Sequence, residues 1–201
     1  MQILPALKIS ELAISFLWMF LLLYDYVKNK RVSAGFVKFG ILFLMSVFIM
    51  TACFSTSIQF QVWEKDPLSQ FILPPFRSID YFYNYAIYRF WLPYVLDVAI
   101  ALAWAFYLML LCKYSNRRFL DEKEVYLGFL TALIAGWPNF IIYVFAVFGL
   151  LVIKQIFNYY ALQKRELIPI APYMIIAAIT VLSLSLYFGD RLGLDKLKLV
   201  S

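Results

Sequence analysis

The stretch ISELAISFLWMFLLLYDYVKNKR, residues 9–31, decides the fold class of this chain. Its apolar run is about as long as the 20 residues that a helix needs to cross the hydrocarbon core of a membrane. The run ends at Asp25, and basic residues follow directly. Because it contains no small-residue cleavage site, we interpret it as an uncleaved first membrane span over residues 9–27 and not as a signal peptide.

The rest of the chain has the same apolar character. Of its 201 residues, 64% are hydrophobic and only 15% are charged, whereas soluble domains contain about 45–50% apolar and about 25% charged residues. We therefore expect an all-α, polytopic integral membrane protein that forms a single membrane domain. About six transmembrane helices are expected, over residues 9–27, 36–57, 90–112, 124–137, 138–157 and 168–188.

Two segments shape this layout. The apolar stretch from Val125 to Phe157 is too long for one crossing, and Gly136-Trp137-Pro138-Asn139 interrupts it. Proline disfavours helical geometry in the residue before it and has no N–H to donate. The aromatic-rich residues 58–90 are interpreted as a non-cytoplasmic layer at the membrane surface, where rings meet lipid headgroups. A lid over a ligand is the alternative for this segment.

The basic residues predict the orientation. If the N-terminus lies outside, the inner loops hold 11 of the 18 lysines and arginines, and these are more densely spaced than the outer seven. An excess of Lys and Arg on the cytoplasmic side is the rule for membrane proteins. We therefore expect both termini outside the cytoplasmic (plasma) membrane, with Asp25 and residues 121–124 on its inner face. Since the net charge of +6 is scattered over segment ends, it indicates contact with membrane lipids and not with nucleic acid.

The residue types restrict the possible chemistry. The chain has no histidine, which excludes Ser-His and Cys-His nucleophiles and His-ligated metals. Cys53 and Cys112 are far apart and form no CxxC pair, so neither a zinc site nor a disulfide framework is expected. Carboxylates are the remaining candidates for catalysis.

Two carboxylates are expected at the same membrane face. Asp25 ends the first span, and Glu124 begins the fourth. Two such groups can share a proton and activate water, as in aspartic proteases. The structural alternatives are that Asp25 is neutralised by Lys28 or Lys30, and that Glu124 only stabilises the N-terminus of its helix.

Two further acids lie toward the other face. Asp97 is inside the third span, where an ionisable group is costly, and we expect it to pair with Arg89 or an aromatic hydroxyl. Glu11 is at the outer end of the first span and is expected to be solvated.

Four stretches resemble motifs of one family. Tyr24-Asp25-Tyr26, with the basic residues after it, resembles YDxRxxxIPDGxV. Residues 115–127, SNRRFLDEKEVYL, align without a gap with the stretch that ends in GxGDxKL. LGFL at 127–130 and AGWPN at 135–139 resemble LGFL and LGWPN, while IPIAPY at 168–173 and FGD at 188–190 resemble IPFGPF and FG(D/E). Together they resemble the type IV prepilin peptidase family, in its short form without the methyltransferase region.

The resemblance implies a membrane aspartic endopeptidase that cleaves the basic leader peptides of pilin-like precursors. It places the catalytic acids at Asp25 and Glu124, and it needs neither a metal nor an organic cofactor. Asp121 and Glu122 would bind the basic leader. The second family aspartate is glutamate here, and the two motif glycines are Asp121 and Lys123. The alternatives are a catalytically inactive relative that serves as a membrane scaffold or assembly partner, and an unrelated small transporter with an aqueous path past Asp97.

Overall fold

The computed structural model describes residues 3–114, 121–161 and 169–188, and within these ranges the regular structure is entirely helical. The helices are α1 (Ile3–Asn29), α2 (Ala34–Lys65), η1 (Ser69–Ile72), α3 (Asp80–Ala86), η2 (Ile87–Trp91), α4 (Leu92–Tyr114), α5 (Glu122–Ala135), α6 (Asn139–Ala161) and α7 (Ala171–Phe188). The expected all-α fold class is therefore correct.

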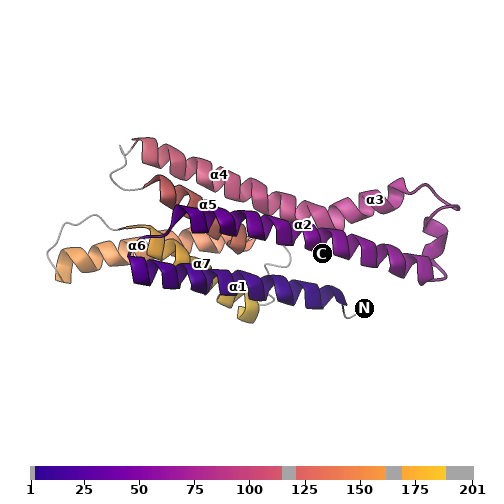
Figure 1. Cartoon of the computed structure of the whole chain (residues 1–201), viewed down its shortest axis with the longest axis horizontal. Coiled ribbons are helices and arrows are strands. Elements are labelled where there is room, and N and C mark those ends of the chain that lie inside the picture. The colour runs from indigo at the N-terminus through magenta and orange to yellow at the C-terminus, as the bar shows by residue number, and fades with distance from the viewer. Residues whose placement is uncertain (1–2, 115–120, 162–168, 189–201) are drawn as a thin grey trace.

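The helices form an elongated bundle (Figure 1). α2 pairs with the continuous helical rod made of α3, η2 and α4, and this long hairpin extends past the N-terminal end of α1. α5 packs against α2, α4, α6 and α7, while α1 packs against α2 and α7. One end of the bundle collects the C-terminal ends of α1 and α4 and the N-terminal ends of α2, α5 and α7. We call this end, with Asp25, Asp121, Glu122 and Glu124, the acidic end.

Four helices are long and apolar enough to cross a membrane: Ile9–Asn29, Ala34–Lys65, Asp80–Tyr114 and Asn139–Tyr160. The other two expected spans are shorter. Ala171–Tyr187 is an apolar helix below this length, and α5 has 14 residues. At a rise of 1.5 Å per residue, α5 is about 21 Å long, against a hydrocarbon core of about 30 Å. The segment expected as the fourth span is therefore a short buried helix.

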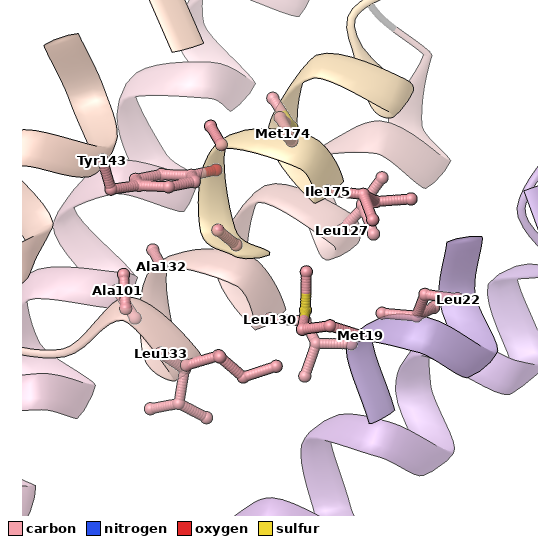
Figure 2. Packing of buried hydrophobic residues seen from close by; sticks show 14 of the residues in the cluster. Met19, Leu22, Ala101, Leu127, Leu130, Ala132, Leu133, Tyr143, Met174 and Ile175 are labelled. Atoms are coloured by element: carbon pink, nitrogen blue, oxygen red, sulfur yellow. The ribbon is translucent and has the colours of Figure 1, made fainter. Parts of the chain in front are cut away.

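The core forms around α5 (Figure 2). Its residues from Leu127 to Ala135 are buried except for Phe129, and they meet Met19 of α1 and Met174 of α7. The Tyr143 hydroxyl of α6 enters this core and lies 2.7 Å from Thr131 Oγ1 of α5. Gly128 lets α5 approach α4 closely, because a Cβ there would collide with Leu108. α5 thus holds the other helices together.

The turn between α5 and α6 lies at the residues that predict it. α5 ends at Ala135, and α6 begins at Asn139. Gly136 has φ +61° and ψ 169°, a conformation that residues with a Cβ rarely adopt. The glycine and the proline together end one helix and begin the next in an antiparallel direction.

The aromatic-rich residues 58–90 are largely helical. α2 continues to Lys65, and α3 with η2 continues α4 in the other direction, so most of this segment extends the two long helices. Leu73, Phe82 and Ala86 form a small buried cluster at its tip, with Phe60 and Trp63 packed against them. We call residues 58–90 the aromatic end.

Candidate functional site at the acidic end

Asp25 closes the turn between α1 and α2. Its Oδ2 accepts a hydrogen bond from the Ser33 backbone N–H at 3.1 Å, and its Oδ1 accepts one from Asn29 Nδ2 at 2.6 Å. Ser33 is the N-cap of α2 but makes no side-chain capping bond itself. The Lys28 ammonium lies over the Tyr24 ring, 5.9 Å from its centroid. Asp25 therefore accepts hydrogen bonds from a backbone N–H and a side-chain amide at a helix end. These are its partners here, where an ion pair with Lys28 or Lys30 was the alternative considered above.

Glu124 occupies a capping box at the start of α5. The Asp121 side chain accepts from the Glu122 N–H at 2.8 Å, and Glu124 Oε2 accepts from the Asp121 N–H at 3.1 Å. In this motif the two side chains satisfy donors that the first turn of a helix leaves unpaired. The sequence from Asp121 to Glu124 is thus an effective helix start.

The other oxygen of Glu124 reaches a second helix. Oε1 accepts from the Ala171 backbone N–H, the first residue of α7, at 3.3 Å. The N-termini of α5 and α7 both face this carboxylate, and helix N-termini favour negative charge. The half-buried Glu124 therefore joins two chain segments that are 47 residues apart.

Four helices converge at this end. The Tyr26 hydroxyl of α1 lies within electrostatic range of the Glu124 carboxylate and of Tyr173 on α7. The Lys38 ammonium of α2 lies over the Tyr126 ring of α5, 4.7 Å from its centroid. Among the described residues, however, Asp25 and Glu124 are hydrogen-bonded to other groups and not to each other. The acids share one end of the bundle while each holds a separate helix terminus.

Asp121 and Glu122, the expected leader-binding residues, are exposed at this end. The Asp121 Oδ1 atom accepts a hydrogen bond from the Glu122 N–H, and the residue as a whole is exposed to solvent. The preceding residues 115–120, the start of the family-like stretch, lie outside the described part of the chain, as do Ile168 and Gly189-Asp190 of the other motifs.

Asp97 has a different partner from the one expected. Its Oδ1 accepts the Trp137 backbone N–H at 2.6 Å, in the turn between α5 and α6. A Cβ on Gly136 would lie 3.2 Å from the same Oδ1. The expected pairing with Arg89 or an aromatic hydroxyl is therefore wrong, because the interrupted helix presents a backbone donor that needs an acceptor inside the bundle.

Glu11 is also not simply solvated, as expected, because its Oε2 accepts a hydrogen bond from the Tyr94 hydroxyl at 3.0 Å. Tyr94 stacks on Phe48 with ring centroids 4.9 Å apart, so α1, α2 and α4 meet here. Glu11 acts electrostatically on Asp97, which places the two acids in one region of the bundle.

The sequence analysis did not predict the roles of Tyr26 and Tyr94, which connect the acids to neighbouring helices. Tyr26 could have been noticed because it follows Asp25 directly, whereas the separation of Tyr94 and Glu11 by 83 residues gives no local pattern. Comparisons of this chain with protein-family models, with curated proteins and with solved structures find no match. The family resemblance therefore depends on the motif stretches alone.

Proposed function

We propose that this chain is a membrane-embedded aspartic endopeptidase of the prepilin-peptidase type, which cleaves basic leader peptides of pilin-like precursors. The observation that carries the proposal is that the C-terminal end of α1, with Asp25, and the N-terminal end of α5, with Glu124, lie at the same end of the bundle (Figure 1). The motif stretches around both acids and the absence of histidine from the sequence support the same chemistry.

In the proposed topology the acidic end faces the cytoplasm and both termini lie outside the plasma membrane. α5 starts at the acidic end, and α6 runs back toward that end in the opposite direction. The acids consequently face the same side whether α5 crosses the bilayer fully or only in part. The denser basic residues of the inner loops support this orientation.

The proposed reaction uses the two acids as a pair that shares one proton. The ionised carboxylate takes a proton from water, and the water oxygen attacks the scissile carbonyl carbon while the protonated carboxyl donates to the carbonyl oxygen. The tetrahedral gem-diol then loses its C–N bond: the leaving nitrogen takes the proton held by the first acid, and a gem-diol hydroxyl returns a proton to the second acid. For this step Asp25 must release Asn29 or Ser33, so that an oxygen becomes free for the water.

The exposed acids give the proposed site its selectivity. Asp121 and Glu122 lie at the mouth of the acidic end, close in sequence to Glu124. Basic residues of a leader would pair with these two carboxylates before cleavage, and such pairing weakens as salt rises. Pilin-like precursors, which combine a basic leader with an apolar helix, are the proposed substrates and partners.

A second candidate, an inactive relative that acts as a membrane scaffold or assembly partner, is favoured by one specific observation. Both oxygens of Asp25 and both oxygens of Glu124 accept hydrogen bonds that stabilise helix ends. Carboxylates used in this way explain their positions without catalysis. The scaffold would bind the same basic segments at the acidic end and release them uncut.

Amide variants separate these two functions. Asp25→Asn and Glu124→Gln keep an acceptor oxygen at each helix end, so both variants should fold. We expect each to reduce leader cleavage in reconstituted membranes by at least about 10²-fold, the lower range for loss of a general acid or base. Glu124→Asp, which restores the acid of the family motif, is the companion variant and should retain cleavage.

The substrate is a pilin precursor with a basic leader, and binding is measured beside cleavage. Uncut precursor that binds the wild type, with binding weakened when Asp121 and Glu122 are both changed to neutral amides, would establish the scaffold. Equal cleavage by the wild type and both amide variants would remove the catalytic assignment.

A further inference from the structure

The long hairpin is longer than a membrane is thick. α2 has 32 residues, and the rod from Asp80 to Tyr114 has 35. At 1.5 Å per residue they measure about 48 and 52 Å, against a hydrocarbon core of about 30 Å. Since the hairpin begins about level with the ends of α1, α5 and α7 at the acidic end, the excess accumulates at the aromatic end (Figure 1).

The charges of α2 define which part of it suits the bilayer. Between Lys38 and Glu64 the helix has no charged residue, a stretch of about 37 Å at 1.5 Å per residue. A stretch longer than the hydrocarbon core is accommodated by tilting. Tilting lowers the aromatic end toward the headgroups, and the polar side chains of Ser57, Gln59 and Gln61 already mark the depth at which α2 leaves the apolar layer.

The surface of the aromatic end combines rings with polar groups. Tyr81, Tyr83 and Tyr88 are each at least half exposed, as are Phe71 and Phe76. These rings stay on the outside because the small core of Leu73, Phe82 and Ala86 packs α3 against α2 beneath them. Tyrosine has an apolar ring and a polar hydroxyl, which suits it to the boundary between acyl chains and water.

The charges of the aromatic end cancel. The segment contains three acidic residues, Glu64, Asp66 and Asp80, and three basic residues, Lys65, Arg77 and Arg89. Binding to anionic lipids usually depends on clusters of Lys and Arg. A surface with no net charge and several exposed tyrosines is suited to lipid headgroups in general, with little preference for anionic ones.

We propose that the aromatic end is a lipid-binding surface that lies in the headgroup layer of the leaflet opposite the acidic end, and that its rings and not its charges hold it there. The proposal is independent of the peptidase proposal, because it uses none of the acidic-end residues. It assigns residues 58–90 to lipid, whereas a protein partner or a lid over a ligand would cover the same rings with protein.

Spin labels on single cysteines test this proposal. The labels are placed by Tyr83→Cys and Tyr88→Cys in the full chain, in which exposed Cys53 is changed to serine and buried Cys112 is kept. Leu102→Cys, exposed on the middle of α4, is the hydrocarbon reference, and Lys123→Cys, exposed at the acidic end, is the aqueous reference. The Cys53→Ser chain without an added cysteine reports background labelling.

The chain is reconstituted in phosphatidylcholine bilayers, with and without phosphatidylglycerol. We expect labels at 83 and 88 to collide less with a water-soluble relaxation agent than the label at 123 and more than the label at 102. Anionic lipid should leave these values unchanged. Labels as accessible as position 123 would overturn the proposal, and so would labels that are immobilised and shielded from both aqueous and lipid-soluble agents, since these indicate a protein cover.

Discussion

Carboxylates accept backbone N–H groups in two different regions of this protein, at the acidic end and at the turn between α5 and α6. Asp25 and Glu124 act at helix ends that are partly open to solvent. Asp97 does the same at a part-buried position inside the bundle, where the hydrocarbon of a membrane offers no replacement for a lost acceptor. The comparison teaches that one kind of contact has different consequences in the two regions, because solvent can substitute for a lost acceptor only at the acidic end.

The largest loss of stability is expected for Asp97→Ala. It removes the acceptor of the Trp137 N–H inside the bundle, at a cost of about 3 kcal/mol in the free energy of unfolding. Asp97→Asn keeps an acceptor oxygen and should lose less than half as much. Unfolding in mixed micelles with increasing denaturing detergent measures both. Equal losses for Ala and Asn would show that the hydrogen bond to Trp137 is not what makes Asp97 important.

Gly136→Ala should follow, with a loss of about 2 kcal/mol, because φ +61° with ψ 169° is a backbone conformation that only glycine adopts easily. The added Cβ would also press on Asp97 Oδ1. Gly149→Ala is the matched control: nothing lies within 4 Å of its Cβ position, and alanine favours the helix by up to about 1 kcal/mol. The same detergent titration applies, and two variants of equal stability would contradict the strained turn.

Glu124→Ala should cost about 1.5 kcal/mol, since it removes one half of the capping box and the bond to Ala171. Glu124→Gln keeps one acceptor oxygen and loses the other, so it should retain about half of this stability. Hydrogen exchange at the first turns of α5 and α7 is the sharper measurement. Faster exchange in α5 alone would mean that Glu124 does not stabilise the start of α7.

Asp25→Ala is expected to have the smallest effect, about 1 kcal/mol or less, because solvent can replace the acceptor for Ser33 and Asn29. Thermal unfolding in mild detergent measures it, with Asp25→Asn as the milder companion. A loss as large as that of Asp97→Ala would remove the distinction between the two regions.

The sequence predicts the helical fold and the turn well, because apolar runs and a Gly-Trp-Pro-Asn break are local patterns. It also predicts that Asp25 and Glu124 lie at helix ends. It does not predict the length of the hairpin, because Pro74-Pro75 and the polar residues of α2 resemble a loop that interrupts the helices.

The contacts of the acids could not be predicted, since the partners are distant in sequence. Asp97 and Trp137 are 40 residues apart, and Glu124 and Ala171 are 47 apart. A backbone N–H has no residue type, so composition cannot reveal that it needs an acceptor. Whether Asp25 and Glu124 can approach one another depends on helix packing, which no local pattern encodes.

The shortness of α5 has a consequence for how the chain is made. With about 21 Å of helix, and with its residues from Leu127 onward covered by neighbours, α5 gains little from entering lipid alone. We therefore expect α5 to be inserted together with α6, as one hairpin. A nascent chain halted at the turn would keep α5 at the membrane surface, and glycosylation mapping of such truncated chains would detect it there.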